Sequence, residues 1–253
     1  MNDLDLCAAQ YCSVAGNLDA NLYRHLQVMR LASEQHIDFL LFPELSLTGY
    51  ETSLAHELAL TADAAQLQPL RELAKQLRMT TLVGLPLRTA ESDAVLIGSV
   101  LFGADGSQTI YTKQYLHAGE ERVFSPGAGG ALLHLGDERI ALSICADFTH
   151  ASHARAAAES GAGIYATSVL ISENGYPHDS ELLEGYAREL SIGVLMANHG
   201  GPSGGWACAG RSAFWEPGGR RVVNAAGTGD CLVIARRRQG SWQGQTLELS
   251  LSE

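Results

Sequence analysis

Runs of apolar residues alternate along this chain with segments of helical periodicity, and this alternation limits the possible folds more than any other feature. Residues 37–42 are almost wholly apolar, which is typical of a strand covered on both faces. Before them, Asn17 is a candidate N-cap for a helix that reaches about residue 36. Its apolar residues share one face at three- and four-residue spacing: Leu18, Leu22, Leu26 and Met29. The pattern predicts an α/β protein.

The same alternation continues to about residue 235. Further helices are expected over residues 63–78, 150–160 and 179–191. Further strands are expected at residues 4–11, 80–85, 95–102, 109–113, 131–135, 139–144, 163–167, 193–197, 212–215, 221–225 and 231–235. No repeat or linker divides the chain, so we expect one domain over residues 1–253. Its core would cover about residues 4–235, and residues 236–253 would form a polar tail that opens with a solvated arginine turn.

Charge and cysteine content exclude several classes of protein. The formal charge is −11, which argues against binding to nucleic acid or to an anionic membrane. The longest apolar stretch, residues 94–104, is too short to span a bilayer, and the acidic start lacks the features of a signal peptide. The five cysteines form no CxxC pair, so neither a disulfide framework nor a thiolate zinc site is expected. We therefore expect a cytoplasmic protein.

Three ionisable residues stand at the C-terminal ends of expected strands: Glu44, Lys113 and Cys145. This is the edge at which open α/β sheets place their ligands. Taken singly, Glu44 is a loop or capping carboxylate, Lys113 an exposed hairpin lysine and Cys145 a small buried residue. Together the three residues predict a reactive site.

The chemistry of a cysteine nucleophile explains why these residue types would be grouped. A cysteine attacks as its thiolate, which is scarce at neutral pH because the ordinary thiol pKa is about 8.5. A neighbouring ammonium favours the thiolate, and so does a helix N-terminus such as the one expected near residue 150. The lysine would also stabilise the oxyanion of a tetrahedral intermediate. A carboxylate would move protons and activate the water that releases the acyl group.

Three sequence blocks that contain these residues resemble the nitrilase superfamily of carbon–nitrogen hydrolases. They are residues 41–50 (LFPELSLTGY), 111–116 (YTKQYL) and 142–147 (LSICAD). Residues 119–127 (GEERVFSPG) resemble the segment that carries the second glutamate of that family, and the spacing to the Pro-Gly pair matches Glu120 better than Glu121. Residues 197–201, 210–212 and 217–219 resemble the C-terminal half of the family, so the resemblance covers about residues 4–235.

The resemblance implies a four-layer α-β-β-α sandwich of nitrilase type that commonly forms homodimers. It also implies that Cys145 attacks an amide carbon to form a thioester, while Lys113 and the backbone N–H of Ala146 stabilise the oxyanion. Glu44 would take the thiol proton, pass it to the leaving ammonia or amine and then activate water. Glu120 would orient Lys113 or the substrate. The implied partner is a small-molecule amide, and no metal or organic cofactor is implied.

One departure from the family pattern bears on the substrate. Members that act on carboxylate-bearing amides often have an arginine two residues beyond the aspartate of the nucleophile block. Here Asp147 is followed by Phe148, Thr149 and His150, so we expect a neutral or differently anchored amide. These three residues either line the pocket or form the first turn of the next helix. Asp147 is either a capping or first-turn acid or a pocket residue.

Two other patterns have competing interpretations. His150 and His153 share one helical face, but no HExxH motif accompanies them, so we expect capping or solvated histidines rather than metal ligands. The glycine-rich residues 199–210 lack a phosphate-binding motif. They form either a mobile loop beside the pocket, with Trp206 as a lid residue, or a plain surface loop.

The sequence therefore favours an amidohydrolase that acts on a small aliphatic or ω-amide. The first alternative is an acyltransferase that passes the thioester acyl group to an amine. The second is a catalytically silent scaffold of the same fold. The remaining cysteines are expected to be structural: Cys7, Cys12, Cys208 and Cys231.

Overall fold

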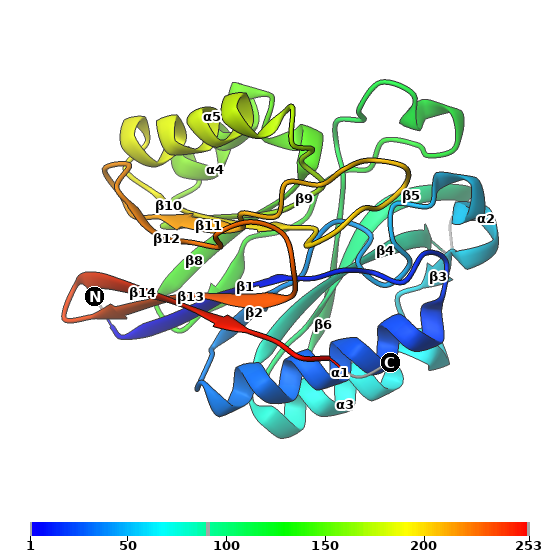
Figure 1. Cartoon of the computed structure of the whole chain (residues 1–253), viewed down its shortest axis with the longest axis horizontal. Helices are drawn as coiled ribbons and strands as arrows, with labels where there is room; N and C mark the ends of the chain where they lie inside the picture. Colours follow the sequence, from blue (N-terminus) through cyan, green and yellow to red (C-terminus); the bar gives the residue numbers. More distant parts are fainter. Residues whose placement is uncertain (1, 90–91, 252–253) are drawn as a thin grey trace.

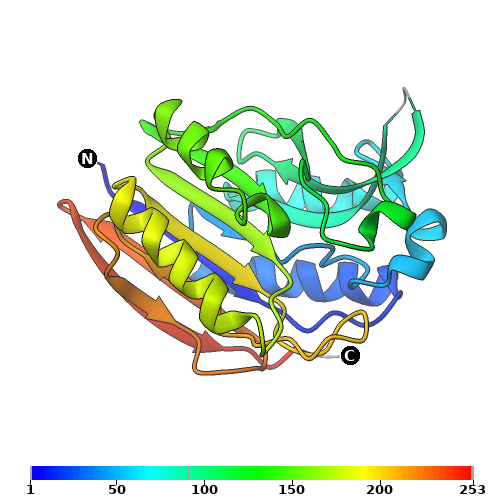
Figure 2. The same ribbon diagram turned by 90° about the horizontal axis from the view of Figure 1, so that it is seen from above.

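Two β-sheets lie face to face, and each is covered on its outer side by a pair of helices (Figure 1). The computed structural model describes residues 2–89 and 92–251. Helices α1 (Leu18–Glu34) and α3 (Gln68–Leu77) cover one sheet, and α4 (Ala151–Glu159) and α5 (Tyr176–Glu189) cover the other (Figure 2). The expected four-layer α-β-β-α sandwich is confirmed. A short helix, α2 (Ala55–Leu58), was not predicted.

The larger sheet holds both ends of the described chain. Its strands, in spatial order, are β14 (Ser241–Glu248), β13 (Cys231–Arg238), β1 (Leu4–Gln10), β2 (Phe39–Leu41), β4 (Thr80–Thr89), β5 (Ser92–Phe102) and β6 (Gln108–Thr112), with β3 (Leu60–Thr61) paired to β4. The smaller sheet has the order β12 (Arg221–Asn224), β11 (Ala213–Trp215), β10 (Gly193–Asn198), β9 (Ile164–Val169), β8 (Glu138–Ile144) and β7 (Leu133–Leu135). The central strands of each sheet are parallel, so their carboxyl ends meet at one edge.

The central strands are buried on both faces. In β1, Leu6 and Ala8 belong to the core between the sheets, whereas Cys7 and Ala9 belong to the core beneath α1 and α3. Successive side chains of a strand point to opposite faces, so both faces must be apolar. This layering accounts for the apolar strand runs and for a charged share of only 18%.

Two helices begin at other residues than predicted. A 3₁₀ turn (Ala65–Leu67) precedes α3, which begins at Gln68 with Pro69 in its first turn. Likewise, α5 begins at Tyr176, before the predicted start at Asp179, and has Pro177 in its first turn. Proline suits this position because the N–H that it lacks would have no partner within the helix. The Asn17 cap is confirmed, since its side-chain oxygen accepts from the nitrogen of Ala20 at 3.0 Å.

The face of α1 that packs on the sheet differs from the predicted stripe of three leucines and Met29, of which only Met29 is fully buried. Its leucines are only partly buried, while Asn21 and His25 are fully buried. Asn21 Nδ2 donates to the carbonyl of Leu47 at 3.0 Å, and His25 Nε2 lies 2.9 Å from Ser46 Oγ. The helix therefore turns these polar groups inward to hold the loop after β2.

The predicted polar tail is wrong. Arg236, Arg237 and Arg238 continue β13, and β14 follows at the sheet edge up to Glu248. Arg237 Nη1 lies 2.6 Å from Glu138 Oε2 of the smaller sheet, and Arg238 Nη2 lies 2.7 Å from Asp5 Oδ2. Carboxylates from β1 and from β8 of the smaller sheet thus neutralise the arginines, which allows a charged run to extend a strand. Within the described residues, no helix is long and apolar enough to cross a membrane.

Candidate active site

Glu44 is held at the end of β2 by close backbone packing. Its side chain is fully buried, and the loop that carries it lies directly on β4. Gly84 makes this contact possible, because a Cβ there would come within 2.5 Å of the backbone nitrogen of Leu45. The position of the carboxylate is therefore set by the backbones of two neighbouring strands.

The smaller sheet also holds this loop. Ser168 Oγ, on β9, donates to the carbonyl of Phe42 at 2.7 Å, and His199 Nε2, after β10, donates to the carbonyl of Glu44 at 2.7 Å. Burial lowers the pKa of His199 to about 4, so its imidazole is neutral. The loop that carries Glu44 is thus tied across the seam between the two sheets.

Lys113 lies between two carboxylates. Its Nζ is 2.7 Å from Glu44 Oε1 and 2.7 Å from Glu120 Oε1, and its side chain is fully buried. Burial alone would lower its pKa, but the carboxylates outweigh burial and hold the pKa above its usual value. The backbone of Gly127 packs against this segment and donates to the carbonyl of Lys113 at 2.7 Å. Lys113 is therefore a buried ammonium, not an exposed hairpin lysine.

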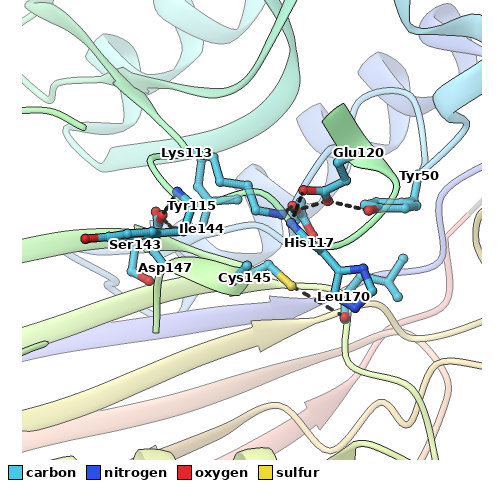
Figure 3. Close-up of polar contacts among 12 residues, drawn as sticks. Tyr50, Lys113, Tyr115, His117, Glu120, Ser143, Ile144, Cys145, Asp147 and Leu170 are labelled. Carbon is cyan, nitrogen blue, oxygen red and sulfur yellow. Dashed lines mark hydrogen bonds and ion pairs between the residues drawn. The ribbon is translucent and has the colours of Figure 1, made fainter. Parts of the chain in front are cut away.

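Glu120 sits in a 3₁₀ turn (Glu120–Arg122) and is 4% exposed. It accepts from Lys113, from the hydroxyl of Tyr50 and, at 2.7 Å, from the backbone nitrogen of His117 (Figure 3). Glu121 is exposed and accepts from the nitrogen of Gly119 instead. The structure places Glu120, rather than Glu121, against the lysine.

Cys145 directly follows β8 and begins a 3₁₀ turn (Cys145–Asp147). Its φ of 43° lies in the left-handed region, which costs energy for a residue other than glycine. Its Sγ lies 3.7 Å from the carbonyl oxygen of Leu170, at the end of the neighbouring strand β9 (Figure 3). Cys145 is partly exposed to a cavity that Glu44 and Ala146 also line.

The electrostatics of Cys145 differ from the sequence-based expectation. Burial and the Glu44 carboxylate raise the pKa of the thiol well above its usual value, and the opposing effect of Lys113 is smaller. Burial of the thiol and the two nearby carboxylates, Glu44 and Glu120, therefore favour the thiol form of Cys145 over the expected thiolate. The helix expected near residue 150 is present, since α4 begins at Ala151.

Glu44 has the properties of a proton acceptor. Burial raises its pKa to about 7, although Lys113 opposes the shift. Its Oε2 is buried and has no hydrogen-bond partner among the residues that the structure describes. A carboxylate with a pKa near neutrality and a free oxygen can take a proton at pH 7 and return it later in a reaction.

Asp147 joins the cysteine turn to the lysine loop. Its buried carboxylate accepts from the nitrogens of Gln114 and Tyr115 at 2.8 and 2.9 Å, from the hydroxyl of Tyr111 at 2.8 Å and from the nitrogen of Ile144 at 3.0 Å. It does not line the cavity. Of the two interpretations of Asp147, the structure supports the first-turn acid.

A cavity of about 400 Å³ opens above Cys145. Phe148, Thr149 and His150 line it and precede α4, which begins at Ala151, so the structure supports the pocket-lining interpretation rather than the first helical turn. Trp206, from the glycine-rich loop, lines it as well and is 47% exposed. That loop therefore borders the cavity, as one of its two interpretations proposed.

The two histidines considered as metal ligands have other contacts. The ring of His150 stacks on Tyr115 with centroids 3.8 Å apart. His153 places Nε2 2.9 Å from the hydroxyl of Tyr111 and Nδ1 2.8 Å from that of Tyr165. Across residues 2–89 and 92–251, no three acidic, histidine or cysteine side chains are grouped to hold a metal ion.

Sequence reasoning gave no role to Tyr50, His199 or Asp179, which contact or line the site. Tyr50 and His199 fall inside the motif blocks, which was the only signal for them. Their contacts join segments that are distant along the chain, so no local pattern predicts them.

The sequence as a whole matches the family described as carbon–nitrogen hydrolase over residues 6–245. The chain therefore belongs to the carbon–nitrogen hydrolase family, and the resemblance noted in its motif blocks is confirmed.

Solved structures of an amidase from Nesterenkonia sp. AN1 have the same fold. A mutant with the acetamide moiety of fluoroacetamide covalently added at its active-site cysteine gives a TM-score of 0.84 at 26% identity, over 92% of this chain and 90% of that chain. A mutant in complex with butyramide gives a TM-score of 0.84 at 25% identity, over 94% of this chain and 92% of that chain.

Two curated relatives are glutamine-dependent NAD(+) synthetases. The protein from Thermotoga maritima is 24% identical over 238 residues, which cover 90% of this chain and 39% of the relative. The protein from Acinetobacter baylyi is 27% identical over 154 residues, which cover 58% of this chain and 28% of the relative. The chain thus spans less than half the length of these relatives.

Proposed function

We propose that this protein is an amidase that hydrolyses the C–N bond of a small linear amide and releases ammonia through a thioester on Cys145. One observation carries the proposal. A buried ammonium, Lys113, lies between Glu44 and Glu120, and Glu44 lines the same cavity as Cys145. The arrangement combines a nucleophile, a base and a fixed positive charge, which are the parts that acyl transfer requires.

In the first half of the reaction, the sulfur of Cys145 attacks the amide carbon while its proton moves to Glu44. A concerted transfer suits this site because the thiol pKa is raised and that of Glu44 is about 7. The Lys113 ammonium and the backbone N–H of Ala146 stabilise the oxyanion of the tetrahedral intermediate. Glu44 then gives the proton to the leaving nitrogen, the C–N bond breaks and ammonia departs.

In the second half, Glu44 takes a proton from a water molecule, and the resulting hydroxide attacks the thioester carbon. The oxyanion again lies at Lys113. When the second intermediate collapses, the C–S bond breaks, the carboxylic acid leaves and the thiol regains its proton from Glu44. Glu120 orients the ammonium throughout, because it contacts Lys113 and is itself held by Tyr50 and His117.

The similar structures support an amide as the substrate class. One neighbour contains butyramide, and another has an acetamide moiety covalently added at its active-site cysteine. The curated relatives are named as glutamine-dependent, and glutamine also contains a primary amide.

Ammonia release from a panel of amides, with butyramide and glutamine among them, tests the proposal. At least one amide should give turnover, and intact mass should show the acyl adduct during the reaction. Cys145→Ala should abolish both signals, whereas the matched variant Cys12→Ala, which removes another partly exposed thiol, should keep them. Ammonia release by Cys145→Ala, or no release and no adduct with any amide, would contradict the proposal.

Addition of hydroxylamine separates hydrolysis from acyl transfer. A hydrolase should form mainly carboxylate even in the presence of moderate amine concentrations. Hydroxamate formed in large excess over carboxylate would favour the acyltransferase alternative.

We also propose that the protein acts in the cytoplasm as a homodimer or higher homo-oligomer. All five cysteines are free thiols, which suits a reducing compartment. Light scattering coupled to gel filtration tests the assembly, since a dimer has twice the chain mass of 27.0 kDa.

A further inference from the structure

The charged side chains that line the active-site cavity are all acidic. No lysine or arginine of the described residues lines it, and Lys113 is already paired with Glu44 and Glu120. The remaining formal charge belongs to Asp179. A substrate carboxylate would find no free cation here, whereas a substrate cation would find a carboxylate.

Asp179 is available to bind a ligand. It lies in the first turn of α5, partly buried, and its side chain has no hydrogen bond or ion pair among the residues that the structure describes. The nearby charged or titratable groups are His178 and His117, both exposed. A half-desolvated carboxylate without a donor gains more from a cation than an exposed one does.

A continuous wall joins Asp179 to the nucleophile. It begins at the carbonyl of Leu170, 3.7 Å from Cys145 Sγ, and continues through Ile171, Ser172 and Gly175. Gly175 keeps this wall open next to the carboxylate, because a Cβ there would lie 3.3 Å from Asp179 Oδ2. The nucleophile and the carboxylate therefore belong to one cavity, which can hold a single small molecule at both ends.

An aromatic side chain completes this end of the cavity. Trp206 lines it with nearly half of its surface exposed, and its ring meets that of His117 edge to face at 6.4 Å between centroids. An exposed indole face attracts a cation, most strongly of the aromatic side chains. Carboxylate and indole together suit an alkylammonium group better than a neutral alkyl group.

We propose that the preferred substrates are small amides with a protonated amine on the carbon chain, and that Asp179 binds the ammonium group while Cys145 attacks the carbonyl. This substrate class rests on the amidase function proposed above. It makes Asp179 a specificity-determining residue of the site.

A set of isosteric amides tests the proposal. The cationic 4-aminobutanamide is compared with the neutral pentanamide and the anionic succinamate at pH 8, above the usual titration range of histidine. We expect kcat/KM for the cationic amide to exceed that for pentanamide by about 10- to 100-fold, as for a hydrogen bond to a charged group, and succinamate to be poorest. Equal rates for the cationic and neutral amides would overturn the proposal.

Variants of Asp179 test whether this residue causes the preference for the cationic amide. Asp179→Asn should reduce the cationic-to-neutral ratio of kcat/KM by about tenfold or more, and Asp179→Glu should restore part of it. Glu173→Gln is the matched control: this exposed residue of the same connecting segment loses the same charge outside the cavity, and the ratio should stay unchanged. A ratio that survives Asp179→Asn, with the variant folded by circular dichroism, would overturn the proposal.

Binding to Cys145→Ala separates this inference from the amidase function. By calorimetry, this variant should bind 4-aminobutanamide more tightly than pentanamide, and the additional change Asp179→Asn should remove the difference. If no amide is hydrolysed but this difference is found, the amidase function fails and the ligand class is supported. If amides are hydrolysed without any cationic preference, the amidase function stands and the substrate class fails.

Discussion

The two edges of the sheet sandwich each combine a cavity with buried charge, but only one of them carries a cysteine beside a buried lysine. At the carboxyl ends of the parallel strands, a cavity of about 400 Å³ lies above Glu44 and Cys145. At the opposite edge, a cavity of about 780 Å³ is lined by Glu138, Arg237 and Trp242, with no cysteine or lysine from the described chain. The larger cavity therefore lacks the groups that the proposed reaction requires.

The two edges differ in how completely their buried charged side chains are paired or hydrogen-bonded. Arg237 has Glu138 at 2.6 Å, the carbonyl of Asn2 at 3.1 Å and the ring of Trp242 at 5.3 Å. At the reactive edge Glu44 keeps one buried oxygen without a partner in the described structure, and burial raises its pKa to about 7. A fully paired ion stabilises a fold, whereas an incompletely paired one can exchange a proton.

The largest expected effect is on kcat, when one carboxylate is neutralised at each edge in turn and only one of the two changes lowers the rate. Glu44→Gln removes the proposed base and should lower kcat by about 10²- to 10⁴-fold, because proton transfer contributes that much to catalysis. Glu138→Gln makes the same chemical change at the other edge and should leave kcat within about twofold, since it lies far from the reacting atoms. Ammonia release measures both, and equal losses in the two variants would remove the distinction between the edges.

The pH dependence of kcat/KM should identify the incompletely paired carboxylate. Below pH 7 Glu44 becomes protonated and cannot accept the thiol proton, so the rate should fall about tenfold per pH unit below the pKa and level off above it. Glu120→Gln removes a negative charge that raises this pKa, so the midpoint should move to lower pH. The exposed Glu121→Gln is the control and should keep the midpoint, and a common midpoint in all three proteins would assign the titration to another group.

A smaller effect is expected from Tyr50→Phe. The hydroxyl of Tyr50 donates to Glu120, which contacts Lys113, so its loss should lower kcat by about 10- to 100-fold, as for a single hydrogen bond to a charged group. Tyr23→Phe, on the exposed side of α1, should leave kcat unchanged. Steady-state rates decide between the two outcomes, and identical kcat values would exclude a role of Tyr50 in orienting the site.

The smallest change in rate, with the clearest change in stability, is expected at the opposite edge. Glu138→Gln weakens the ion pair with Arg237 and should lower the free energy of unfolding by about 1–3 kcal/mol, the range for a hydrogen bond to a charged group. Denaturant titration followed by circular dichroism measures this. An unchanged midpoint would mean that the second charge cluster contributes nothing to the fold.

The sequence predicted those parts of the site that depend on strand order. Strand ends carry Glu44, Lys113 and Cys145, and the carboxyl ends of parallel strands meet at one edge, so their convergence follows from a local pattern. The sign of the cysteine pKa shift did not follow, because it depends on how deeply the thiol is buried and on which charges surround it in space. The strand at Arg236–Arg238 was missed for a similar reason, since only the folded chain brings Asp5 and Glu138 to these arginines.

The hydrogen bonds from Ser168 and His199 to the loop that carries Glu44 make the geometry of the site depend on how the two sheets are aligned. The proposed base, Glu44, and the proposed nucleophile, Cys145, come from different sheets. A small sliding of one sheet over the other would therefore separate them while every strand stayed paired. Turnover should therefore vanish before secondary structure does. A gently heated sample that keeps its circular dichroism spectrum but no longer releases ammonia would be a protein whose strands are intact and whose two sheets no longer fit together.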